Sequence, residues 1–151
     1  MRFHHLALFL HLTGVVLWVG GMVFIRVCLV SPTLTAAQWA EALAHFFSLS
    51  WVAIALIVIT GGFMLIAVGY ARAPLGWLLM TFLGTIMIVV FASLWFGPWM
   101  ALREALAKGG LAQAQAQAQA RAAIQRINKH LDIVLVLAIL TAVAATLGLA
   151  L

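Results

Sequence analysis

Charged residues are scarce in this chain. They make up 7% of its 151 residues, whereas 67% of the residues are hydrophobic. A soluble domain usually carries about 25% charged residues, so the composition excludes an ordinary soluble globular protein. The mean hydropathy of +1.22 indicates a membrane protein.

Acidic residues and cysteines are scarcer still. The three acidic residues, Glu41, Glu104 and Asp132, are scattered along the chain, so they form no paired-carboxylate motif. Neither a Ser-His-Asp pattern nor a phosphate-binding glycine loop is present, which argues against hydrolytic chemistry. Cys28 is the single cysteine, so the chain has no internal disulfide and no Cys-x-x-Cys site.

Long apolar runs are abundant instead. A hydrocarbon core of about 30 Å requires about 20 helical residues, and four segments meet this length, at about 3–30, 48–70, 75–98 and 130–151. The first segment is expected to be retained as a membrane helix because it is longer than a signal-peptide core. The sequence therefore predicts an all-α, polytopic membrane protein, a four-helix up-and-down bundle that forms one domain over 1–151.

Local signals predict how these helices begin and end. Thr35 and Gln38 form a capping-box pattern that starts an amphipathic lead into the second helix. Pro74 fits the first position of the third helix, and Gly97-Pro98 predicts a bend near its end. The Ala/Gln-rich region of about 100–129 predicts a solvated cytoplasmic helical hairpin before the fourth helix.

Basic residues lie between the apolar segments, where lipid headgroups would meet them, and this distribution argues against nucleic acid as a partner. The positive-inside rule places the more basic side in the cytoplasm. Both chain termini are then on the non-cytoplasmic side of a bacterial-type inner membrane. The more basic side carries Arg26, Arg103, Lys108, Arg121, Arg126 and Lys129, and the other side carries Arg2 and Arg72.

The first apolar segment contains a motif of histidine, tryptophan and glycine. His11 and Trp18 are seven residues apart and share one helix face, which His4 extends. Gly20 and Gly21 remove bulk near that face, so a second helix or a flat cofactor can approach. An ionisable side chain in lipid is costly and is a functional candidate. The alternative is a neutral histidine hydrogen-bonded to a neighbouring helix.

The predicted topology sorts the five histidines into two layers about 25 Å apart along the helices. One iron or copper ion therefore cannot bind both layers. The outer layer holds His4, His5 and His11, and the cytoplasmic layer holds His45 and His130.

Each layer has a candidate ligand set. In the cytoplasmic layer, His45 and His130 would come from diagonal helices and hold a haem in the bundle core. Arg26, Arg126 and Lys129 would neutralise its propionates. The alternative is two interfacial histidines beside a basic surface.

In the outer layer, Met64 and Met80 are expected near the height of His11, and imidazole with thioether suits haem iron or Cu(I). His4 and His5 are candidates for capturing an incoming metal ion. The alternative is that the methionines are packing residues and the two histidines are interfacial.

The motif of His11, Trp18 and the following glycines resembles that of the CopD-like family of four-helix membrane proteins, which is distantly similar to the protoporphyrinogen oxidase HemJ. This resemblance implies a helical bundle with His11 as a haem or copper ligand. HemJ carries a lysine in its third helix and this chain has none there, so porphyrinogen oxidation is not implied. The weaker matches are Phe46-Phe47, Trp51, Thr60-Gly61-Gly62, Phe96-Gly97-Pro98 and Arg126-Ile127.

Three functions follow as hypotheses. The first is a membrane protein with haem b that exchanges electrons with quinone or a partner redox protein. The second is a protein that transports copper or confers resistance to it. The third is a small accessory subunit that packs in a larger membrane complex or in a homo-oligomer.

Overall fold

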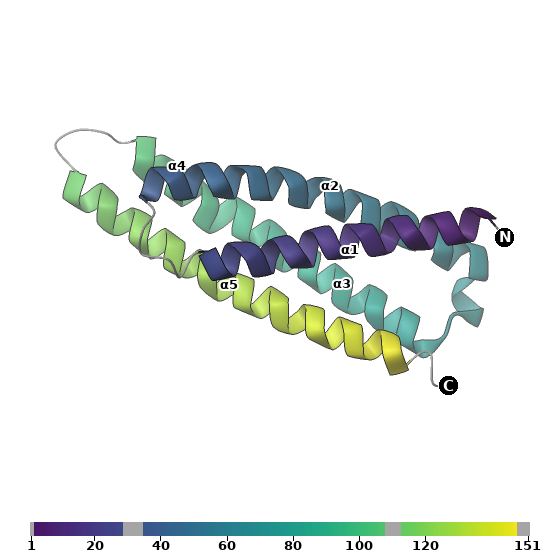
Figure 1. The fold of residues 1–151 in the computed structure, drawn as a ribbon. Coiled ribbons are helices and arrows are strands. Elements are labelled where there is room, and N and C mark those ends of the chain that lie inside the picture. Colours follow the sequence, from purple (N-terminus) through teal and green to yellow (C-terminus); the bar gives the residue numbers. More distant parts are fainter. Residues whose placement is uncertain (1, 29–34, 108–112, 148–151) are drawn as a thin grey trace.

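The computed structural model describes residues 2–28, 35–107 and 113–147, and within these ranges it contains helices and no strands. The prediction of an all-α fold is confirmed. Residues 29–30, 108–112 and 148–151 of the predicted segments lie outside the described residues. The elements in chain order are α1 (Arg2–Cys28), α2 (Ala36–Val68), the 3₁₀ turn η1 (Tyr70–Arg72), α3 (Leu75–Leu94), the π-helical turn η2 (Trp95–Trp99), α4 (Met100–Ala107) and α5 (Gln113–Leu147) (Figure 1).

The helices form an elongated bundle. The start of α1, the end of α5 and the turn η1 lie at one end, which we call the N-terminal end (Figure 1). The ends of α1 and α4 and the starts of α2 and α5 lie at the other end, which we call the hairpin end. α1 packs mainly on α2, and α3 and α4 pack mainly on α5. The bundle is thus two helical pairs joined by fewer contacts.

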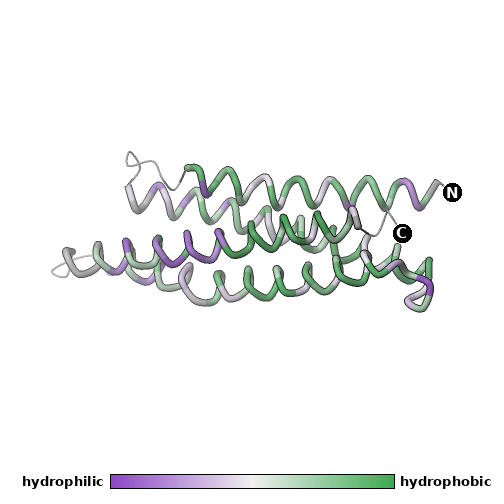
Figure 2. The backbone as a smooth tube through the Cα atoms, turned by 90° about the horizontal axis from the view of Figure 1, so that it is seen from below, coloured by the Kyte–Doolittle hydropathy of each residue, from purple (hydrophilic) through white to green (hydrophobic). Residues whose placement is uncertain are grey.

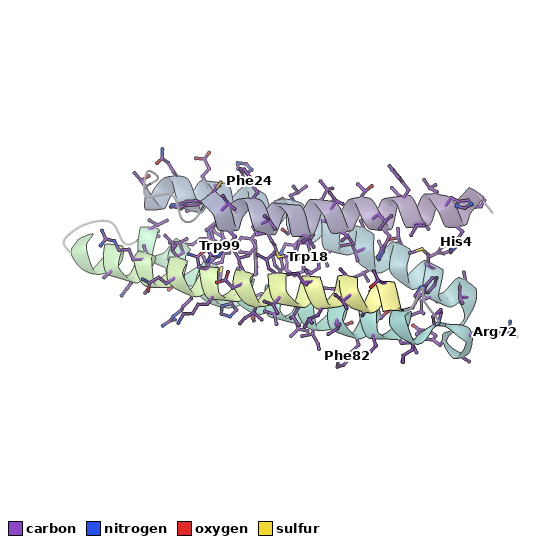
Figure 3. All side chains as sticks on the ribbon, turned by 60° about the horizontal axis from the view of Figure 1, so that its bottom comes forward. His4, Trp18, Phe24, Arg72, Phe82 and Trp99 are labelled. Atoms are coloured by element: carbon purple, nitrogen blue, oxygen red, sulfur yellow. The ribbon has the colours of Figure 1, made fainter. Side chains whose placement is uncertain are left out.

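Within residues 2–28, 35–107 and 113–147, four helical segments are long and apolar enough to cross a membrane, as the sequence predicts. Large apolar side chains cover the outside of these segments, among them Phe24 and Phe82, which point away from the bundle (Figure 3). Polar residues gather at the hairpin end of α5 (Figure 2). Exposed apolar surface on this scale indicates contact with lipid rather than water. The segments are Phe3–Cys28, Gln38–Val68, Leu75–Ala107 and Ala118–Thr146.

The second and third helices begin where the sequence indicates, with a shift of one residue at α3. The backbone N–H of Thr35 donates to Gln38 Oε1 at 2.9 Å, and the backbone N–H of Gln38 donates to Thr35 Oγ1 at 3.3 Å. The capping box is therefore present, and α2 runs without interruption for 33 residues from Ala36. Pro74 is the N-cap residue of α3 and not its first helical residue, because the helix begins one residue later, at Leu75.

The predicted bend at Gly97-Pro98 is a π-helical turn between α3 and α4. Pro98 has no backbone N–H, and its ring crowds the preceding turn, so the α-helical bond pattern cannot continue through it. In a π turn the carbonyl oxygen accepts its hydrogen bond from the N–H five residues later instead of four, and the helix stays continuous. The result is one long, slightly irregular rod from Leu75 to Ala107.

The core of the bundle is aromatic. The fully buried Phe91 ring has four aromatic neighbours, with ring centroids between 5.5 and 6.1 Å away. Edge-to-face and tilted pairs of this kind add stability beyond the area that they bury. The group, which we call the aromatic cluster, draws on α1, α2, α3 and η2 and holds the two helical pairs together. Its members are Trp18, Phe46, Phe47, Trp51, Phe91, Trp95 and Trp99.

This core occupies only part of the length of the bundle. It extends towards the N-terminal end as far as Ile54 on α2, Met87 on α3 and Val134 on α5. Beyond those positions few described side chains are buried, so the N-terminal end is packed less closely than the hairpin end. The buried residues there are Ala7, Gly14, Thr60, Met64, Leu65, Gly76 and Ala144.

The expectation that 100–129 is a solvated hairpin needs correction. Leu102 and Ala105 of α4 are buried, as are Ala120 and Ala123 of α5. Alanines three residues apart lie on one helix face, and their small side chains let α5 approach α4 closely. The described charged residues of this region are exposed, so this part of the bundle is polar outside and packed inside. They are Arg103, Glu104, Arg121, Arg126 and Lys129.

Candidate functional site

His11 lies half-buried in α1, against the middle of α2. Its Nδ1 atom is 3.2 Å from the carbonyl oxygen of Ile57 and 3.2 Å from Thr60 Oγ1. A carbonyl oxygen can only accept a hydrogen bond, so Nδ1 must carry a proton and donate it. In the neutral ring the other nitrogen, Nε2, then carries the lone pair.

Two glycines make this close approach of α1 and α2 possible. A Cβ atom at Gly61 would lie 3.0 Å from Cε1 and 3.3 Å from Nδ1 of His11. A Cβ atom at Gly14 would lie 2.9 Å from Ile57 Cγ1 and 3.1 Å from the carbonyl oxygen of Ala53. Small residues at a helix interface let backbones approach in this way within membranes. The His11 ring therefore lies where α2 presents no side chain.

The partners of His11 on α2 are residues that sequence reasoning did not assign to the site. Thr60 and Gly61 appeared only as part of a weak family resemblance, and Ile57 contributes through its backbone. A threonine followed by glycine in the middle of an apolar helix is a detectable signal. It does not reveal which helix it faces, because that depends on the register between α1 and α2.

Trp18 and Gly21 lie in the packed core. Trp18 is 3% exposed and lies edge-on to Phe91, with ring centroids 5.7 Å apart and an interplanar angle of 88°. Its Nε1 has no hydrogen-bond partner among the described residues. A Cβ atom at Gly21 would lie 3.3 Å from the Phe46 ring, whereas one at Gly20 would meet nothing described within 4 Å. Figure 3 shows Trp18 and Trp99 inside the bundle.

The structure keeps His11 apart from His45 and His130. Gly21 of α1 lies beside Phe46, the neighbour of His45, at about 15 Å along the helix from His11. Arg26 of α1 contacts Asp132, close to His130, at about 22 Å along the helix from His11. One metal centre therefore cannot join His11 to either of the other two histidines.

His45 and His130 do not form a pair that faces the bundle core. At the level of His45 the buried face of α2 consists of Leu43, Phe46 and Phe47, and His45 itself is exposed. The Nδ1 atom of His130 is 2.8 Å from the carbonyl oxygen of Arg126 in its own helix. The expected haem between these two imidazoles in the core therefore has no support, because His45 lies on the outer face of α2.

The basic residues expected to bind propionates are placed differently. Arg26 Nε is 2.6 Å from Asp132 Oδ1, and Nη2 is 3.4 Å from Oδ2, so the guanidinium forms a two-pronged ion pair that joins α1 to α5. Arg126 and Lys129 are exposed on α5. Sequence reasoning missed the ion pair because its partners are 106 residues apart.

The outer histidines and methionines are spread over several faces. His4 and His5 are exposed, with ring centroids 6.4 Å apart. Met64 is buried one turn after Thr60, on the same face of α2 that meets α1. Met80 is half-buried on α3, which does not pair with α1. In the part of the chain that the structure describes, no three His, Cys, Asp or Glu side chains converge on a metal position.

No family model matches this chain, and neither a curated protein nor a solved structure matches it. The resemblance to the CopD-like family therefore rests on the motif residues alone.

Proposed function

We propose that this chain is an integral membrane redox protein of the CopD/HemJ-like type, which binds haem b at His11 and passes electrons to or from quinone or a partner protein. The observation that carries the proposal is the setting of His11. Its Nδ1–H is held by α2, and Nε2 is left with the lone pair that a metal needs.

The residues around His11 fit a histidine that would ligate a haem iron. Histidines that ligate metals usually donate their other ring N–H to a backbone carbonyl or a carboxylate, which fixes the ring. Ile57 supplies such a carbonyl, and Gly61 leaves room for the ring. A bound haem supplies the one-electron chemistry, and the chain supplies the orientation of the imidazole and the apolar surroundings.

The position of His11 along the bundle supports the same proposal. It lies beyond the limit of the aromatic core, in the half where few side chains are buried. A flat cofactor inserts between helices more readily where they are not already closely packed. At the hairpin end, the aromatic cluster fills the corresponding space.

The membrane arrangement that we propose is an up-and-down bundle in a bacterial-type inner membrane. The hairpin end faces the cytoplasm and both termini face away from it. The six-to-two distribution of basic residues supports this orientation, and so does the gathering of hydrophilic residues at the hairpin end of α5 (Figure 2).

A visible spectrum of the protein tests the proposal. The protein is produced in membranes with haem supplied and purified in detergent. We expect a Soret band with split α and β bands in the wild type, and loss of these bands in His11→Ala. His45→Ala and His130→Ala are the matched controls and should retain the bands, since both residues lie far from His11.

Two results would contradict the proposal. One is a wild type that binds no haem, and the other is an undiminished spectrum in His11→Ala. A colourless protein that retains Cu(I) would favour the second candidate, copper handling. The structure favours this candidate in one respect, because Met64 lies on the α2 face that meets α1, and His4 extends the His11 stripe. A protein that binds neither would favour an accessory subunit.

A further inference from the structure

We infer that Thr60 is a positioning residue that holds His11 as its Nδ1–H tautomer and thereby selects Nε2 as the atom that meets a metal ion or haem iron. The choice of tautomer stands on the contacts alone. The ligand that Nε2 meets rests on the proposed function.

The hydroxyl of Thr60 is already committed as a donor. Thr60 is 6% exposed, and its Oγ1 is 2.6 Å from the carbonyl oxygen of Leu56. A hydroxyl has one proton and two lone pairs, so a proton directed at Leu56 leaves only lone pairs towards His11. Oγ1 therefore accepts from Nδ1, at 3.2 Å.

Both atoms that face Nδ1 are acceptors, and this makes the choice of tautomer unequal. The Ile57 carbonyl oxygen and Thr60 Oγ1 each lie 3.2 Å from Nδ1. The Nε2–H tautomer would set the lone pair of Nδ1 against these two oxygens and leave the contact without a proton. A polar group left without a hydrogen bond in a partly buried position destabilises the fold by more than a formed hydrogen bond stabilises it. The α2 surface therefore selects the Nδ1–H form.

Thr60 is the part of this arrangement that a side-chain substitution can remove. The Ile57 carbonyl also belongs to the backbone of α2, where it is an acceptor of the helical ladder. Valine has the shape of threonine without the hydroxyl, and serine keeps the hydroxyl without the methyl group. The pair Thr60→Val and Thr60→Ser thus separates the hydrogen bond from the packing.

Nitrogen NMR of the full chain in detergent micelles tests the inference directly. The protein carries [¹⁵N]histidine, and spectra are recorded at pH about 9, where unperturbed imidazoles are neutral. The His11 signals are those lost in His11→Gln. We expect His11 Nδ1 to be protonated and Nε2 to be of the unprotonated type. The exposed rings of His4 and His5 provide the internal comparison.

The variants then assign the effect. Thr60→Val should lower the Nδ1–H fraction of His11 several-fold, and Thr60→Ser should restore it. Thr85→Val is the matched control, because Thr85 also donates to a carbonyl in its own helix, that of Thr81 at 2.8 Å, but lies exposed on α3. A wild-type His11 in the Nε2–H form overturns the inference, and so does an unchanged tautomer in Thr60→Val. If the valine variant does not fold, the wild-type and serine spectra still decide.

A titration with haemin separates this inference from the proposed function. Loss of an outer-shell partner of a ligating histidine lowers affinity by about 10–100-fold, and we expect a loss of this size in Thr60→Val and not in Thr85→Val. A wild type that binds no haemin contradicts the proposed function, while the NMR result for the tautomer still stands. Equal haemin affinity in Thr60→Val and wild type contradicts the positioning role.

Discussion

The glycines of the Thr60-Gly61-Gly62 segment are chemically identical neighbours with different surroundings. Gly61 faces the His11 ring, whereas a Cβ atom at Gly62 would meet nothing described within 4 Å. We expect Gly61→Ala to push the ring from its place and to lower the free energy of unfolding by about 1–3 kcal/mol, as overpacking does. The measurement is denaturant unfolding in detergent, followed by tryptophan fluorescence.

Gly62→Ala is the control for Gly61→Ala. It should raise stability by up to about 1 kcal/mol, because alanine is the better helix former. Equal effects of the two substitutions would show that Gly61 is not a contact point for His11.

At the residue scale, the sequence predicted that His11 is special but not what it touches. The cost of an ionisable group in lipid singles out this histidine without any structure. Its partners come from a turn of α2 that is 46 to 49 residues away, and no periodicity within α1 states the register between the two helices. His45 lies among apolar residues that do face the core, and the sequence therefore predicted that it faces inwards. In the structure it is exposed.

At the element scale, the turn η2 sets how α4 meets α5. Adding one residue to a π turn rotates the following helix by about 100° relative to an uninterrupted α-helix. In the observed rotation Leu102 and Ala105 are buried, and α4 packs mainly on α5. We expect Pro98→Ala to restore a continuous α-helix and to turn these two residues partly outwards.

Hydrogen exchange measures this effect of Pro98→Ala. The amides of α4, residues 100–107, should exchange several-fold faster in the variant, while those of α1 should be unchanged. Unaltered exchange in α4 would mean that packing against α5, and not the proline, maintains the π turn.

The elements themselves show which signals a sequence carries. The Thr35 cap and the irregularity at Pro98 are local, because they depend on which backbone N–H groups are present or satisfied, and both are found in the structure. The packing of the hairpin is not local. Ala120, at the end of the alanine–glutamine alternation, and Ala123 lie three residues apart on one face, and only the position of α4 shows that these two alanines are buried.

At the scale of the whole molecule, the orientation in the membrane can be tested with reporters. We expect a reporter inserted between α4 and α5 to be active in the cytoplasm, and one fused after Leu151 to be active on the opposite side. The reason is the excess of basic residues near the hairpin end. The reverse pattern would contradict the proposed orientation and would exchange the sides of the two histidine layers.

The length of α2 has a consequence for what holds the molecule together. Its 33 residues span about 50 Å, and a bilayer core of about 30 Å covers only part of that length. Glu41, Arg103 and Glu104 are exposed at the hairpin end, so we expect the buried Trp39, Leu43 and Leu102 to lie in a stalk surrounded by water. The hydrophobic effect stabilises that stalk, so cooling and urea lower its stability. The part within lipid has no such driving force and depends on close packing and on hydrogen bonds between helices, such as that of His11 to α2. One continuous helix thus passes through two solvents. We expect conditions that weaken the hydrophobic effect to unfold its water-exposed part, and loss of close packing to unfold its part within lipid.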